Sequence, residues 1–218
     1  MFLSGVTLPV PYYGQISSVQ CQSTVLSMYA QYLDTKNSRS GAGGKQVQEI
    51  FDEINTPQGN PDKRPSTVKN AHSNMMWWLE NNYAPLKFTR LATRDSSVAH
   101  KAVTNAIDRG FPLIASVSHA RVAGHINIIV GYVRENHVNQ SIDHTNSKVV
   151  VHDPYGAFHP SLQSDLHGNK RFSVGMSLAA GGEIGPGRNV ALRLGDVNRQ
   201  RSGDNPERFG NYEFMYPI

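Results

Sequence analysis

The sequence predicts an α+β fold in which a helical half is followed by an antiparallel sheet half. Between Cys21 and Arg109 the apolar residues recur at helical spacing, in segments that are separated by loops. Three later segments, 112–118, 126–135 and 148–153, are rich in Val and Ile and are separated by turn residues. In a fold of this kind a cleft forms where the two halves meet.

The first helix is expected to run from Cys21 to about Asp34, after a short extended segment at residues 7–15. Its apolar positions fall at helical spacing and give it one buried face. These positions are Val25, Leu26, Tyr29, Tyr32 and Leu33. A loop rich in Ser and Gly, 37–44, separates this helix from a second one over residues 45–54.

Two further helices are expected after a loop at residues 56–65, which carries three prolines. The third helix begins at Ser66, a suitable N-cap, and runs to about Asn82. The fourth covers residues 95–109, with an Asp-Ser-Ser cap at its start and a glycine at its end. The helical half is therefore expected to contain four helices.

At 218 residues the chain fits a single domain, 1–218, that is long enough to bury a sizeable core. We expect the core to cover about residues 8–165 and residues 166–218 to form a C-terminal extension. A weakly alternating segment at 86–91 is expected to be a strand. Residues 212–216 are expected to close the sheet as a final strand.

The composition indicates which classes of binding partner and cofactor to expect. The net charge of +4 and the pI near 9.2 favour an anionic partner such as a bacterial wall. The basic residues are scattered and form no stripe with aromatic residues, so we expect no nucleic-acid partner. The nine histidines show no His-Glu-x-x-His pattern and no Cys/His spacing typical of zinc, so we expect no metal and no other cofactor.

The sequence predicts a protein without a membrane span and without a secretory signal. The longest apolar run, 126–130, is too short to cross a bilayer. The first residues lack the charged start and the long apolar segment of a secretory signal. We therefore expect cytoplasmic synthesis, with another route of delivery if the protein acts at a cell wall. Because the chain has a single cysteine, an internal disulfide is excluded.

That cysteine, Cys21, lies at the predicted start of a helix. Unpaired N–H groups and the helix dipole at such a position favour a thiolate, which is the reactive form of cysteine. Gln15 precedes Cys21 by six residues. Its side-chain amide and the backbone N–H of Cys21 can together hold the oxyanion of a tetrahedral intermediate. These two residues are candidates for a nucleophile and an oxyanion hole.

Two later segments offer the partners that a thiolate needs. His125 begins an apolar strand and Asp153 ends another. An imidazole can stabilise the thiolate and protonate a leaving amine, and a carboxylate can hold that imidazole in the right tautomer. Asn127 shares a strand face with His125, and Tyr155 follows Asp153, so both are candidates to bind substrate or support the cleft. His152 should point to the opposite face from Asp153 and be structural.

Three sequence words carry a resemblance to a known family. They are Val10-Pro11-Tyr12-Tyr13-Gly14-Gln15, the segment from Gly124-His125 to Gly131-Tyr132, and Asp153-Pro154-Tyr155-Gly156. Together with the segment 105–117 between them, they resemble the C39-like group of papain-fold cysteine peptidases. The resemblance covers roughly residues 8–165. It implies a papain-like fold, in which a helical half packs on an antiparallel sheet half.

The resemblance also implies a role for each candidate. Cys21 would be the nucleophile, His125 the acid and base, Asp153 the residue that orients the histidine, and Gln15 part of the oxyanion hole. The chain departs from the family pattern directly after the cysteine, where Gln22-Ser23 replaces smaller residues. Bulkier residues in the first helical turn can change the floor of the cleft. Gln22 is therefore a candidate substrate contact.

The function expected from these residues is that of a thiol-dependent peptidase or amidase with an acyl-enzyme intermediate. The basic pI favours a peptidoglycan peptide as substrate, which fits a phage lytic enzyme or an antibacterial toxin. One alternative is a protease that acts on a protein or a leader peptide, and a transpeptidase would use the same chemistry. Another is a papain-fold module that binds peptide or glycan without reacting. A metal-dependent hydrolase is a third.

Overall fold

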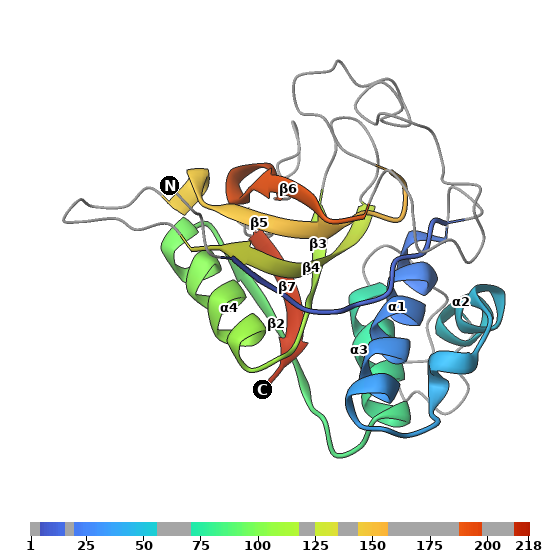
Figure 1. Cartoon of the computed structure of the whole chain (residues 1–218). Helices are drawn as coiled ribbons and strands as arrows, with labels where there is room; N and C mark the ends of the chain where they lie inside the picture. Colours follow the sequence, from blue (N-terminus) through green and yellow to red (C-terminus); the bar gives the residue numbers. More distant parts are fainter. Residues whose placement is uncertain are drawn as a thin grey trace.

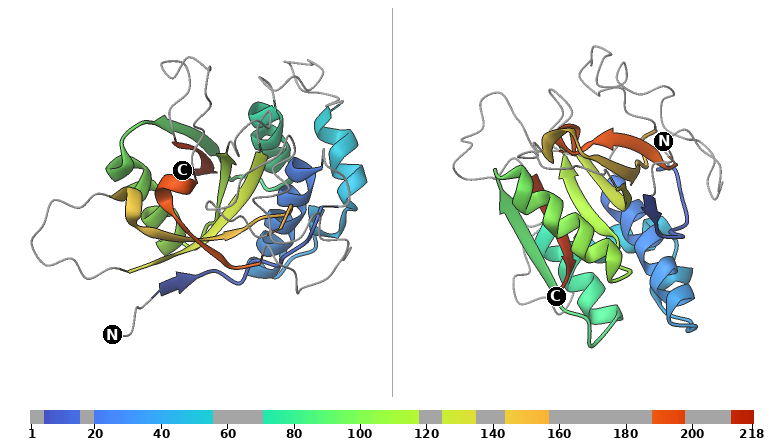
Figure 2. Two further views of the ribbon diagram at one scale, coloured as in Figure 1. Left: turned by 90° about the horizontal axis from the view of Figure 1, so that it is seen from above. Right: turned by 60° about the vertical axis from the view of Figure 1, so that its left-hand side comes forward.

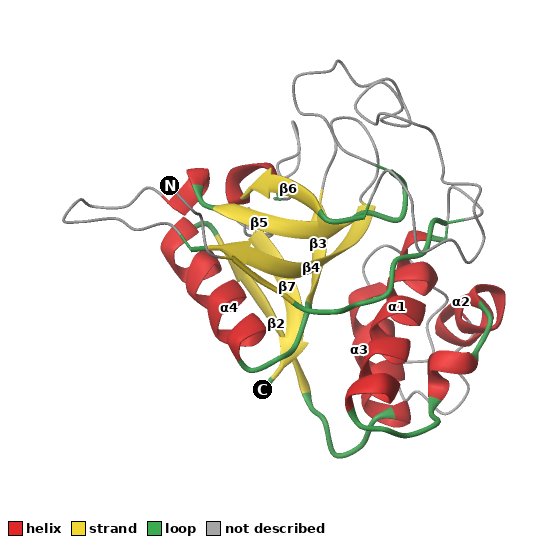
Figure 3. Cartoon of the chain, viewed as in Figure 1, coloured by secondary structure: helices red, strands yellow, loops and turns green. Residues whose placement is uncertain are grey.

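A computed structural model describes residues 5–15, 20–55, 71–117, 125–134, 144–156, 188–197 and 212–218. These residues form three layers, with a central sheet between two sets of helices (Figures 1 and 3). Helices α1 to α3 cover one face of the sheet and α4 covers the other, as both views in Figure 2 show. The predicted α+β class, with an N-terminal helical half packed on an antiparallel sheet, is confirmed.

Helix α1, Cys21–Lys36, is the central helix of the first layer. Its residues from Ser23 to Ala30 are all buried, so it is enclosed on nearly all sides instead of presenting one wet face. It lies against β4 of the sheet, and α2 and α3 pack beside it. Because the first turn of α1 is buried, the hydroxyl groups in it form hydrogen bonds with the nearby backbone. The side chains of Ser23 and Thr24 both donate to the carbonyl of Gln20.

Helices α2 at Val47–Asn55 and α4 at Ser96–Asp108 have bounds close to those expected from the sequence, and α3 at Ala71–Asn82 ends where expected. The short 3₁₀ turns η1 at Ala42–Gly44, η2 at His144–Asn146 and η4 at Leu194–Asp196 were not expected, and η1 lies in the predicted loop 37–44. Asp95 caps α4 by accepting from two backbone N–H groups, and Gly110, with φ of 78°, follows its end as predicted. The predicted loop 56–65 and the predicted start of the third helix at Ser66 lie outside the described residues.

The sheet contains seven described strands, all paired antiparallel. They are β1 at Gly5–Thr7, β2 at Phe88–Thr93, β3 at Leu113–Val117, β4 at His125–Val133, β5 at Lys148–His152, β6 at Val190–Arg193 and β7 at Tyr212–Pro217. Their order is β2-β7-β3-β4-β5-β6, and β1 pairs with the far end of β4. The strands expected from the Val and Ile pattern are confirmed. Strands β1 and β6 were not expected.

The alternation of side chains along the strands divides the core between the two faces. Ile126, Ile128 and Val130 of β4 pack with the side of α1 to α3. Ile129 of β4 and Val151 of β5 belong to the cluster that contains α4. Because both faces of the central strands are covered, these strands read as nearly continuous apolar runs.

The C-terminal strand lies inside the sheet. Residues 212–216 were expected to close it, whereas β7 pairs with β2 on one side and β3 on the other. Phe214 and Met215 are both fully buried, one on each face. Glu213 is 1% exposed and pairs with Arg90 of β2 and with His72 of α3. The end of the 166–218 extension is thus part of the core, and the single domain over residues 1–218 stays a prediction.

Within the described residues, no helix has the length and apolar character needed to cross a lipid bilayer.

Candidate active site

Cys21 is the first residue of α1, and its side chain is half-buried. The side chain of Gln20 does not cap the helix, because it donates instead to Oε1 of Gln48 in α2 at 2.8 Å. The first N–H groups of the helix are therefore not occupied by this side chain. A thiol at such a helix start lies in the positive field of the backbone N–H groups.

His125 is the first residue of β4 and is only 7% exposed. Its Nε2 lies 2.7 Å from Oδ1 of Asp153, the residue that follows β5. The thiol of Cys21 lies close enough to the same imidazole to raise its pKa. Because Nε2 is occupied by Asp153, Nδ1 is the nitrogen that remains for the thiol. The structure thus brings together a helix start, a strand start and a strand end that are far apart in sequence.

The electrostatics of this group favour a charged imidazole. Burial would lower the pKa of His125, but the carboxylate of Asp153 and the hydrogen bonds with Asp153 and Cys21 raise it to about 10. At neutral pH the imidazole is then protonated and lies beside the sulfur.

Asp153 is 1% exposed and is held in place by the turn that it begins. Its Oδ1 accepts the backbone N–H of Tyr155 at 2.9 Å in addition to the bond with His125. Its carbonyl accepts the N–H of Gly156, whose φ of 126° is a conformation that side-chain-bearing residues rarely adopt. The carbonyl also accepts the hydroxyl of Tyr12 at 3.2 Å. These contacts fix the carboxylate relative to the backbone.

Gln15 lies beside the same turn and is 1% exposed. Its backbone N–H donates to the carbonyl of Pro154 at 2.8 Å. Upstream of it, the carbonyl of Val10 accepts Nε2–H of His152 at 2.9 Å. The N-terminal segment is thus bonded along its length to the end of β5, which brings Gln15 next to Asp153.

His152 has the structural place that strand alternation predicts. Its Nε2–H donates to Val10, and its Nδ1 accepts the backbone N–H of Asn189 at 3.0 Å. Its ring also meets Tyr12 edge to face. Burial lowers the pKa of His152, so a neutral ring joins the N-terminal segment, β5 and the segment before β6.

The three candidates for substrate binding differ in how deeply their side chains are buried. The ring of Tyr155 meets that of His125 edge to face, with centroids 6.0 Å apart, and Gln22 is half-buried in the first turn of α1. Asn127 is fully buried and pairs with Ala115 of β3. Neither polar atom of its side chain has a hydrogen-bond partner among the described residues. Asn127 therefore lies inside the sheet layer and not on an accessible wall.

Two contacts at the site were not expected from the sequence. The hydroxyl of Tyr12 holds the backbone of Asp153, and Gln20 links the start of α1 to α2. The position of Tyr12 within the Val10–Gln15 word was the available signal, but a pattern of letters does not say which atom a hydroxyl reaches. The described residues contain no group of three or more His, Cys, Asp or Glu side chains that could hold a metal ion.

Comparisons with known proteins identify the family of the chain. A model of the Peptidase_C39 like family matches residues 7–172, a range that contains Gln15, Cys21, His125 and Asp153. No curated protein matches the chain. Among solved structures, the chain is similar to xylellain, a cysteine protease from Xylella fastidiosa, with 12% sequence identity and a TM-score of 0.36. That match covers 99% of this chain and 86% of the other.

Proposed function

The chain belongs to the Peptidase_C39 like family and is a cysteine peptidase, and we propose that Cys21, His125 and Asp153 form its catalytic triad. One observation carries this proposal. The imidazole of His125 lies 2.7 Å from the carboxylate of Asp153 and also lies close enough to the thiol of Cys21 for the sulfur to raise its pKa. This is the arrangement that a thiolate nucleophile with an oriented acid and base requires.

The proposed reaction has two halves. The thiolate of Cys21 attacks the carbonyl carbon of a peptide bond, and the resulting tetrahedral intermediate collapses as His125 gives its proton to the leaving amine. A thioester to Cys21 remains, and His125 is now neutral. His125 then takes a proton from water as the water attacks the thioester carbonyl. The acid product leaves, and the thiolate and the imidazolium are restored.

Gln15 and the backbone N–H of Cys21 are proposed as the donors that hold the oxyanion. The support for Gln15 is its burial at 1% exposure and the bond from its N–H to Pro154, directly after Asp153. A donor held in a buried place needs little reorganisation when charge develops on the substrate.

Three neighbours are proposed to shape the cleft. Tyr155 packs against the ring of His125 and, with Gln22 in the first turn of α1, is proposed to contact the substrate. Asn127 was a candidate for the same role, but its full burial favours support of the cleft from within the sheet.

The proposed substrate is a peptide of bacterial peptidoglycan, and the proposed setting is a phage lytic enzyme or an antibacterial toxin. The support is electrostatic, because a chain with a net charge of +4 and a pI near 9.2 is attracted to an anionic wall. This attraction raises the local concentration of enzyme at the wall and does not by itself select a bond.

Purified sacculi provide the test. Wild type should release fragments with new amine and carboxyl ends in mass spectra, whereas Cys21→Ala should release none, because it lacks the sulfur. We expect a loss of at least about 10³-fold in rate. Release by Cys21→Ala at the wild-type rate would refute the nucleophile. If wild type releases nothing from any wall type but cleaves a protein, the wall substrate is wrong and the chemistry stands.

A further inference from the structure

The N-terminal segment 8–15, which carries Gln15, follows β1 and is held to the end of β5 by single hydrogen bonds. The hydroxyl of Tyr12 donates to the carbonyl of Asp153 at 3.2 Å. The N–H of Gln15 donates to the carbonyl of Pro154 at 2.8 Å. The position of the proposed oxyanion donor relative to the proposed triad therefore depends on the contacts of this segment.

His152 contacts the same segment nearer its start. Its Nε2–H donates to the carbonyl of Val10 at 2.9 Å, and its Nδ1 accepts the N–H of Asn189 at 3.0 Å. A ring that donates from Nε2 and accepts at Nδ1 is a single neutral tautomer. Burial lowers the pKa of His152, which agrees with this form. The ring also meets that of Tyr12 edge to face, with centroids 5.6 Å apart. His152 thus contacts segment 8–15 at two residues.

The place of His152 in the sheet lets it link the two halves of the proposed site. It is the last residue of β5, directly before Asp153, and it pairs with Ile128 of β4. Ile128 packs on the side of α1 to α3, and α1 begins at Cys21. The ring of His152 is 1% exposed, so a lost bond would not be replaced by one to bulk water.

We propose that His152 is a positioning residue for the peptidase reaction, because it holds the segment that carries Gln15 against the turn that carries Asp153. This inference rests on the roles proposed above for those two residues. Both nitrogens of the His152 ring are occupied by backbone groups, so neither remains to exchange a proton with a substrate. His152 therefore acts through the residues that it holds. A misplacement of about 1 Å in such a group can cost about 10²-fold in rate.

Two variants separate the two bonds of the ring. His152→Gln places an N–H near the position of Nε2, so it can still donate to Val10. His152→Asn reaches only the position of Nδ1, so it can accept from Asn189 but cannot reach Val10. Each variant loses the ring and one bond, so both should lose similar stability in urea unfolding. With the substrate that wild type cleaves, sacculi or a protein, His152→Gln should stay within about threefold of the wild-type maximal rate. His152→Asn should fall roughly tenfold or more, with a smaller change in KM.

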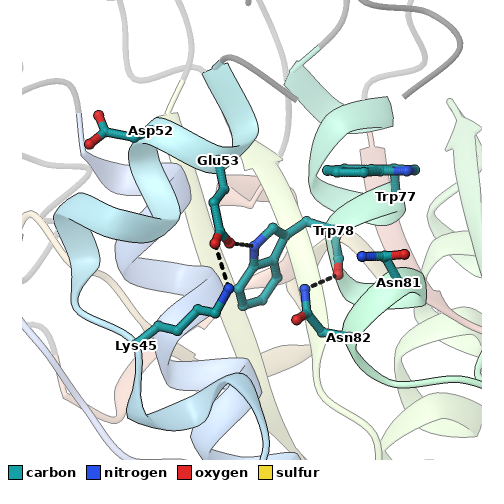
Figure 4. A pocket seen from close by; sticks show the side chains of 7 residues that line it. All are labelled: Lys45, Asp52, Glu53, Trp77, Trp78, Asn81 and Asn82. Atoms are coloured by element: carbon teal, nitrogen blue, oxygen red, sulfur yellow. Dashed lines mark hydrogen bonds and ion pairs between the residues drawn. The ribbon is translucent and has the colours of Figure 1, made fainter. Parts of the chain in front are cut away.

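Two further variants check the origin of this loss. His152→Phe keeps a ring beside Tyr12 and makes neither bond, so its rate should fall as in His152→Asn. Trp78→Phe is the control for lost stability. It removes the Nε1–H that donates to Glu53 at 2.6 Å between α3 and α2, a contact that includes none of the residues proposed for catalysis (Figure 4). Trp78→Phe should lose stability and keep the maximal rate.

A double-mutant cycle shows whether the effect of His152 passes through Gln15. In Gln15→Ala the donor whose place His152 is proposed to set is absent. His152→Asn should therefore lower the rate by a smaller factor in Gln15→Ala protein than in wild type. An equal factor in both proteins would mean that His152 acts independently of Gln15, and this would overturn the inference.

The other outcomes are equally decisive. The inference is overturned if His152→Asn and His152→Phe keep the wild-type rate, or if His152→Gln loses as much rate as His152→Asn. It is also overturned if Trp78→Phe loses as much rate as His152→Asn. If Gln15→Ala keeps the wild-type rate, the proposed role of Gln15 and this inference both fail. In each of these cases, loss of activity in Cys21→Ala would still support the proposed peptidase.

Discussion

The imidazole of His125 lies 2.7 Å from the carboxylate of Asp153, and the two residues are 28 positions apart in sequence. Both come from the same end of neighbouring antiparallel strands, since β4 starts at His125 and β5 ends just before Asp153. Antiparallel pairing places a strand start beside a strand end, so the contact follows from topology. The carboxylate then decides the charge of the imidazole that lies beside Cys21.

Asp153→Asn tests whether the negative charge of Asp153 is needed in addition to its hydrogen bond with His125. The asparagine carbonyl can still accept from His125, but the negative charge is gone, so the pKa of His125 should fall below about 10. We expect kcat to fall roughly 10²- to 10⁴-fold, with a smaller change in KM. NMR titration of the His125 ring gives the pKa and steady-state kinetics give the rate. An unchanged pKa together with a normal kcat would contradict the proposed role of Asp153.

The stability of the protein should depend on pH through His125. Its pKa is raised from an ordinary value of 6.5 to about 10, so folding favours the protonated ring. This contribution to the free energy of unfolding is fully present below about pH 6.5, declines as pH rises, and is lost above about pH 10. Urea unfolding of wild type and His125→Gln across this range measures it. The difference between them should shrink with rising pH, and a constant difference would exclude the effect.

Tyr12→Phe tests the bond that holds the backbone of Asp153. The change removes the hydroxyl that donates to the Asp153 carbonyl and keeps the ring that packs on His152. We expect a loss of about 1 kcal/mol in the free energy of unfolding and a lower kcat. Tyr83→Phe is the matched control, because its buried hydroxyl donates to the carbonyl of Ala30 within α1.

Tyr83→Phe should lose a similar amount of stability and keep its kcat. If both variants reduce kcat equally, Tyr12→Phe lowers kcat by destabilising the whole fold and not by displacing Asp153.

Asn127→Val should stabilise the protein. The amide is fully buried and has no hydrogen-bond partner among the described residues. Burying an unpaired amide costs free energy, and the valine variant does not have this cost. Valine also suits a strand position next to Ala115. We expect a gain of about 1 kcal/mol in the free energy of unfolding, measured with urea.

The contrasting variant is Asn74→Leu, in which a buried amide that donates to the carbonyl of Ile54 is lost. That carbonyl would be left without its partner, so stability should fall. A loss of stability in both variants would show that Asn127 does take part in a bond that its replacement breaks.

The parts of the fold that could be predicted are those with a local cause. The helical spacing of residues such as Val25 and Leu33 identified α1, and Asp95 marked the start of α4 through its own bonds to the next N–H groups. The Val and Ile runs identified β3, β4 and β5. Each signal acts over a few residues, so each can be read along the chain.

By itself, then, the sequence determined the class of fold and the main elements and singled out the proposed reactive groups, because periodicity, capping and thiol chemistry are properties of short segments. Only the tertiary structure decided what those groups touch. It set β7 between β2 and β3, placed His125 beside Cys21 and bonded it to Asp153, and brought Lys45 and Glu53 to Trp78. Such contacts join residues far apart in the chain, and they form only when burial of the two core faces selects one packing.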